Sequence, residues 1–301
     1  FYPYITITEN TGSPQGGPQP QGVGSPSAMP PVSAPFPSVG GWVVAYLDKF
    51  YDDGSTNYPG ADQYYTNGIN DIVGGAAEWS MPVEEYPIKF GRTYTQADRN
   101  NSWAVLADWL YDPDYRNFYY FGHGAPNSIG GDISTVDSSN NITGDTDLPG
   151  SKAKLTSEYV HNSLLFDKYG GARPYRFAYL DGCNTANGNW PWAFGIANQT
   201  EPLSYYTSSA NTEHTRPSAF VGWNVEIGGN KSWGTIQNFW KFREYWAAEW
   251  AGTAGESLYQ SFIDANAISG WVSSGQLNAH LVEYGYNQMG YRDFDYGGDW
   301  P

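Results

Sequence analysis

Basic side chains are scarce in this sequence. Its 301 residues include 15 Lys and Arg against 31 Asp and Glu, so the formal net charge is −16. Proteins bind nucleic acids largely through cationic side chains that displace counterions from the phosphates, and the deficit therefore argues against nucleic acids and anionic membranes as partners. Apolar runs are short as well. None approaches the roughly 18 residues that a membrane-spanning helix needs, so the sequence predicts no membrane span.

Cysteine is almost absent, since Cys183 is the only one in the chain. A lone cysteine forms no internal disulfide, so covalent cross-links do not stabilise the fold. The thiol is then a small buried hydrophobic group, an intermolecular link or a nucleophile, and the first is the commonest state of a free cysteine. The acidic stretch 132–147 lacks the spacing of a calcium loop. We expect a solvated loop there, and neither a metal nor a cofactor in the protein.

Uncharged polar and aromatic residues take the place of charges. The chain has 25 Tyr, 13 Trp and 36 Gly, while only 15% of its residues are charged. This composition is more typical of secreted than of cytosolic proteins. The first residue is Phe1 rather than Met, which a removed export signal would explain. We therefore expect an extracellular protein.

The N-terminal 40 residues differ from the rest. In residues 1–10, "FYPYITITEN", Ile5 and Ile7 fall on one side of an alternating pattern that predicts a β-strand. Residues 11–40 carry no charge and are dominated by Pro and Gly, so they predict an extended linker that builds no core. This N-terminal part is either a propeptide or an assembly arm.

From residue 41 to 301 the pattern is that of one α/β domain. Apolar runs that read as buried strands alternate with amphipathic segments that read as helices, which favours a mainly parallel sheet covered by helices on both faces. The predicted strands are 42–48, 86–95, 117–121, 175–181, 218–223 and 280–286, and the predicted helices lie around 103–110, 154–169, 233–247 and 258–265.

Two of these strands end beside a reactive side chain. "NFYYFGHG" (117–124) ends at His123, and "RFAYLDGCNTAN" (176–187) presents Cys183. Ligands of α/β sheets bind outside the carboxyl ends of the strands. A nucleophilic cysteine needs a base, which His123 can supply, and the N–H of Gly124 can bind an oxyanion. The other histidines, at 161, 214 and 280, are expected to be surface or packing residues.

These two stretches, in this order and with His123 standing 60 positions before Cys183, resemble the caspase-like clan of cysteine peptidases, which includes caspases, metacaspases, gingipains and bacterial CHAT domains. The resemblance implies a three-layer caspase-like sandwich. It implies Cys183 as nucleophile, His123 as general base, and the N–H groups of Gly124 and Cys183 as oxyanion hole. Trp223 and Asn224 would stand near the specificity pocket. Gly182 is a departure, because many members have Ala or Ser there.

Two functions follow as hypotheses. The first is a secreted cysteine endopeptidase that acts on peptide substrates. The second is a self-assembling extracellular filament subunit, in which the strand at 1–10 adds to the sheet of a neighbouring subunit with Ile5 and Ile7 turned inward. In that case the protein is a homo-oligomer and the Cys183 site is vestigial.

Overall fold

The computed structural model describes residues 40–48, 61–78, 80–90, 94–112, 114–130, 135–136, 142–144, 154–162, 175–211, 216–227, 233–252, 256–269 and 280–291. The predicted N-terminal strand with Ile5 and Ile7, and the linker up to residue 39, lie outside the described residues.

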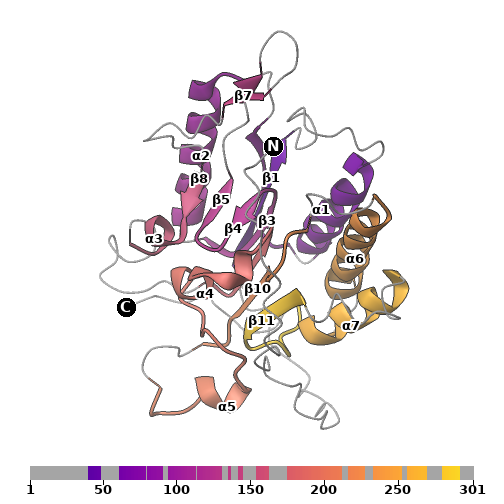
Figure 1. Ribbon diagram of the computed structural model, residues 1–301. Helices are drawn as coiled ribbons and strands as arrows, with labels where there is room; N and C mark the ends of the chain where they lie inside the picture. The colour runs from indigo at the N-terminus through magenta and orange to yellow at the C-terminus, as the bar shows by residue number, and fades with distance from the viewer. Residues whose placement is uncertain are drawn as a thin grey trace, which may run out of the picture.

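A six-stranded sheet forms the centre of the domain (Figure 1). Its order is β11-β10-β9-β3-β1-β2. Every neighbouring pair is parallel except β10 with β11, which is antiparallel. The predicted strands 42–48, 117–121, 175–181 and 218–223 are therefore adjacent in the sheet, which confirms the prediction of a mainly parallel α/β arrangement. The strands are β1 (Gly41–Asp48), β2 (Val83–Lys89), β3 (Tyr115–Phe121), β9 (Phe177–Asp181), β10 (Ala219–Trp223) and β11 (Leu281–Gly285).

The side chains of alternate residues in these strands pack into two separate hydrophobic cores. In β1, Trp42 and Val44 pack into one core, while Val43, Ala45 and Leu47 pack into the other. This period of two follows from the pleat of a strand, and the burial of both faces explains why the strand sequences read as continuous apolar runs. Each fully buried aliphatic side chain contributes about 1.5–3 kcal/mol of transfer free energy.

Helices cover both faces and complete a three-layer structure. Figure 1 shows α1 (Ala61–Glu78), α6 (Trp233–Gly252) and α7 (Leu258–Ser269) on one side of the sheet and α2 (Gln96–Tyr111) with α3 (Ser157–Tyr159) on the other. The short helices η2 (Thr185–Asn187), α4 (Trp190–Ala193) and α5 (Leu203–Tyr206) lie between β9 and β10 in the chain. No helix within the described part of the chain is long and apolar enough to cross a membrane.

Local signals explain where α2 begins and which face it buries. Thr95 is its N-cap, and the Thr95 and Asp98 side chains form a reciprocal capping box, which satisfies N–H groups that the first turn leaves unbonded. Trp103, Leu106 and Leu110 recur at helical spacing and are buried. Helix α1 is not among the predicted elements, although Ile69, Ile72 and Ala76 have the same kind of spacing and are also buried.

Three predicted elements differ from those observed. Residues 154–156 begin the predicted helix 154–169 but form strand β8 (Lys154–Thr156), because Leu155 pairs with Ile129 and is buried. Strand β8 joins β4 (Gly124–Ala125) and β5 (Ser128–Gly130) in a small sheet, and within 132–147 a hairpin of β6 (Thr135–Val136) and β7 (Ile142–Gly144) replaces part of the expected loop. The strand predicted at 86–95 starts earlier and ends at Lys89.

Candidate active site

The register of β3 and β9 determines how His123 and Cys183 are related. The two strands are parallel neighbours, and Phe121 and Asp181 form the last pair between them. His123 and Cys183 each stand two residues beyond this pair. The Gly122 N–H donates to the Asp181 carbonyl at 3.3 Å, so the chains stay in contact after the strands end. The histidine and the cysteine therefore leave the same edge of the sheet from adjacent strands.

Glycines let the two chain segments approach closely at this edge. A Cβ atom placed on Gly182 would lie 3.0 Å from the N and Cα atoms of Gly124 and 2.9 Å from the Gly122 carbonyl oxygen. Real Cβ atoms are seldom this close to backbone, so the contact leaves no room for a methyl group. The backbone that follows His123 thus touches the backbone that precedes Cys183.

The hairpin of β4 and β5 orients the Gly124 N–H. The His123 carbonyl accepts a hydrogen bond from Gly130 N–H at 3.0 Å and one from the Tyr120 hydroxyl at 2.9 Å. Bonded and non-bonded pairs alternate along an antiparallel ladder. Because His123 bonds to Gly130, the next pair, Gly124 with Ile129, is a non-bonded one. The Gly124 N–H consequently points away from the hairpin.

Hydrogen bonds hold the loop that carries Cys183. The Ile227 N–H donates to the Cys183 sulfur at 3.3 Å, and the Asn184 N–H donates to the Val225 carbonyl at 3.0 Å. Asn184 adopts φ = 57°, a left-handed conformation that Asn tolerates better than most residues. Cys183 is half-buried and packs against the core that contains Trp223 and Ile227. A backbone donor therefore holds the sulfur in place at the border of this core.

A second anchor of this loop is the Thr185 hydroxyl. It donates to the carbonyls of Leu180 at 2.7 Å and Gly182 at 3.0 Å, and it accepts from the Trp223 N–H at 3.2 Å. These bonds tie the end of β9 to the end of β10 around the turn that presents the cysteine.

A buried ion pair lies in the core beside the ends of these strands. Asp181 and Arg243 of α6 are each about 1% exposed, and the guanidinium donates to both carboxylate oxygens, with Nη2 to Oδ1 at 2.8 Å. The Tyr119 hydroxyl at 2.9 Å and the Trp223 indole N–H at 2.8 Å also donate to this carboxylate. Burial raises the pKa of Tyr119, so its hydroxyl keeps its proton and acts as a donor.

Sequence reasoning assigns no role to either Asp181 or Arg243. The signals are present: Asp181 ends a buried apolar strand, and Arg243 lies between core residues of α6, such as Phe242 and Trp246. A charge on the buried face of a strand or helix needs a partner, yet the sequence does not say which residue that partner is.

The two residues predicted near the specificity pocket differ in their surroundings. Trp223 is fully buried, donates to Asp181 and packs against Phe239 and Phe242, so its side chain belongs to the core. Asn224 is half-buried at the edge of the sheet, where its side-chain oxygen lies 3.2 Å from Nδ1 of His280.

The remaining histidines lie in different places. His161 is buried and stacks on Trp192 with ring centroids 3.5 Å apart, and desolvation lowers its pKa. It is a packing residue, as expected. His280 contacts Asn224, a contact that the sequence does not predict, and His214 lies outside the described residues.

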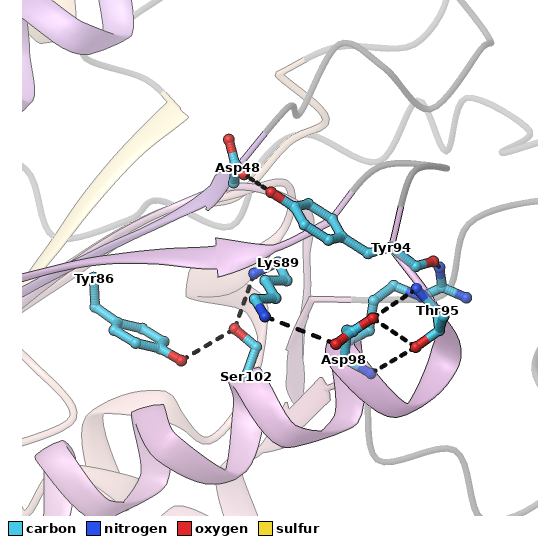
Figure 2. A network of polar contacts seen from close by, with 8 residues as sticks. Asp48, Tyr86, Lys89, Tyr94, Thr95, Asp98 and Ser102 are labelled. Carbon is cyan, nitrogen blue, oxygen red and sulfur yellow. Dashed lines mark hydrogen bonds and ion pairs between the residues drawn. The ribbon is translucent and has the colours of Figure 1, made fainter.

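Another polar network occupies the carboxyl ends of β1 and β2 (Figure 2). The Tyr94 hydroxyl donates to Asp48, and this bond is the main cause that raises the pKa of Tyr94 to about 12. The Lys89 ammonium group pairs with Asp98 at 3.8 Å, and the backbone N–H of Lys89 donates to the Ser102 hydroxyl at 2.9 Å. Across the described ranges, no group of three or more His, Cys, Asp and Glu side chains could hold a metal ion.

Comparison with known proteins adds no assignment: no model of a protein family matches the chain, and no curated protein sequence matches it.

Proposed function

We propose that the protein is a secreted cysteine endopeptidase with a caspase-like fold, in which Cys183 is the nucleophile and His123 the general base. The observation that carries this proposal is the in-register pairing of β3 with β9, from which both residues emerge at the same edge. Function depends on such a site rather than on the fold. The uncharged polar composition supports an extracellular place of action.

The order of the elements also supports the resemblance to caspase-like peptidases. The strand that leads to His123, the strand that leads to Cys183 and the strand that follows them in the sequence are β3, β9 and β10, three consecutive members of the sheet. The resemblance depends on these three segments, and their adjacency is what a shared site requires.

The proposed reaction is the hydrolysis of a peptide bond in two steps. His123 takes the proton of the Cys183 thiol, and the thiolate attacks the carbonyl carbon of the scissile bond. His123 then gives the proton to the leaving amine, which leaves an acyl group on the sulfur as a thioester. A water molecule, deprotonated by His123, hydrolyses the thioester and restores the thiol.

Backbone donors would stabilise the charge that develops in the first step. The Gly124 N–H points away from its hairpin and lies beside Gly182, next to the nucleophile. An N–H group in this position, together with that of Cys183, is suited to bind the oxyanion of a tetrahedral intermediate. The Ile227 N–H that already bonds to the sulfur favours a negative charge there.

The test uses substitutions at the two reactive residues and a proteome-derived peptide mixture as substrate. We expect the wild type to cleave peptides, Cys183→Ala to abolish cleavage and labelling by iodoacetamide, and His123→Ala to slow cleavage by about 10²–10⁴-fold. His161→Ala is the matched control, since that histidine packs on Trp192, and it should cleave at the wild-type rate. Cleavage that survives Cys183→Ala, or a wild type that cleaves no peptide, would overturn the proposal.

A further inference from the structure

One arginine of helix α6 contacts the last residues of both strands that lead to the proposed catalytic pair. The Arg243 guanidinium lies over the Phe121 ring, with Cζ 4.5 Å from the ring centroid. The same group makes a two-pronged ion pair with Asp181. Phe121 ends β3 and Asp181 ends β9, and these two residues are register partners. Arg243 is therefore linked to both reactive residues through the strand ends that stand two positions before them.

The carboxylate that Arg243 holds is bound on every side. Tyr119 of β3, Trp223 of β10 and Arg243 of α6 all donate to Asp181 of β9. Trp223 also donates its backbone N–H to Thr185 in the cysteine loop. A bidentate guanidinium–carboxylate pair has a fixed planar geometry, and a buried pair leaves its partner uncompensated when one member is lost. The position of the strand ends thus depends on the position of Arg243.

We propose that Arg243 is a positioning residue for Cys183 and His123, through which helix α6 sets the reactivity of the thiol. The proposal rests on the function proposed above only in taking Cys183 as a nucleophile paired with His123. Arg243 acts through Asp181 and Phe121, whose shift would displace the segments that carry the thiol and the imidazole.

The chain offers a matched control in Arg176. This arginine is also fully buried and precedes the same strand, β9, but at the opposite edge of the sheet. Its guanidinium donates to Asn117 Oδ1 at 2.8 Å and to the carbonyls of Gly290 and Tyr291 at 2.7 and 3.0 Å. Arg176→Lys therefore disturbs a buried guanidinium just before the same strand without touching the strand ends beside Cys183.

The experiment measures the second-order rate of Cys183 alkylation by iodoacetamide from pH 5 to 9, in wild type, Arg243→Lys and Arg176→Lys, at a temperature where each variant is folded. Thiolate that is stabilised by a neighbouring imidazolium reacts at lower pH than an ordinary thiol. We expect Arg243→Lys to react at least about tenfold more slowly at pH 6 and to reach the wild-type rate only at high pH. Arg176→Lys should keep the wild-type profile even if it lowers the unfolding temperature.

Tyr119→Phe is a second variant in case Arg243→Lys does not fold. It removes one donor to Asp181 and leaves the ion pair, so we expect a smaller shift of the profile in the same direction. A wild-type profile in a folded Arg243 variant, or in Tyr119→Phe if the former does not fold, overturns the positioning role. So does an equal shift in Arg176→Lys. If the wild type cleaves no peptide but Arg243→Lys still shifts the profile, the peptidase function fails and the positioning role stands.

Discussion

Replacing Gly182 with alanine tests the close approach on which the candidate site depends. The added methyl group would lie 3.0 Å from the N and Cα atoms of Gly124 and 2.9 Å from the Gly122 carbonyl oxygen. These neighbours are backbone atoms of a hydrogen-bonded segment, so they cannot rotate away as a flexible side chain would. The substitution must therefore push the segments after β3 and β9 apart.

The expected loss of stability follows from two opposing effects. Overpacking a filled site costs about 1–3 kcal/mol, while replacing glycine restricts the unfolded chain and returns about 0.4–1 kcal/mol. We expect a net decrease of about 1–2 kcal/mol in the free energy of unfolding. For a domain of this size that corresponds to a fall of roughly 2–8 °C in the melting temperature.

Thermal unfolding followed by circular dichroism measures this effect, and Gly74→Ala is the control. Gly74 lies in helix α1 and is exposed, and an alanine Cβ at this position would have no heavy atom within 4 Å. Alanine there should stabilise the protein by about 0.5–1 kcal/mol, because glycine is a poor helix former. If Gly182→Ala is as stable as Gly74→Ala, the segments that carry His123 and Cys183 are not in contact, and the reasoning about the site is wrong.

Four further predictions concern other parts of the molecule. Thr95→Ala removes the N-cap of α2 and should lower the free energy of unfolding by about 0.5–2 kcal/mol in urea denaturation. In an ultraviolet titration Tyr94 should ionise near pH 12, and Asp48→Asn should lower that pH because the hydrogen bond to the Asp48 carboxylate is the main cause of the raised pKa. The stability from this bond is present below about pH 10 and is lost as the pH rises through 12. Burial raises the pKa of Glu283 to about 7. The free energy of unfolding of the wild type should therefore fall between about pH 4.5 and 7 relative to that of Glu283→Gln. Parallel plots of this free energy against pH for the two proteins would contradict the prediction. If residues 1–10 are an assembly arm, their deletion should leave a folded monomer in analytical ultracentrifugation, and an assembly that persists would refute the arm.

The sequence alone determined the buried strands and most of the long helices. The sequence predicts four of the strands, β1, β3, β9 and β10, because both faces of each are buried. A strand that is buried on both faces is apolar along its whole length. Helices such as α2 could be read from one buried stripe at helical spacing. His123 and Cys183 could be placed at strand ends for the same reason, since the apolar runs stop just before them.

Pairing between distant segments was decided only by the tertiary structure. Leu155 lies in a strand rather than a helix because Ile129 is its partner in a ladder, and a few residues of local sequence carry no record of that partner. Asp181 and Arg243 are 62 positions apart, and the sequence around either residue does not predict that it pairs with the other. Trp223 stands at the end of its strand, where the resemblance to caspase-like peptidases implied a pocket, but its indole lies in the core and donates to Asp181. Local propensity depends on neighbours in the chain, whereas burial and ion pairing depend on which elements pack together, and that choice is made by the whole fold.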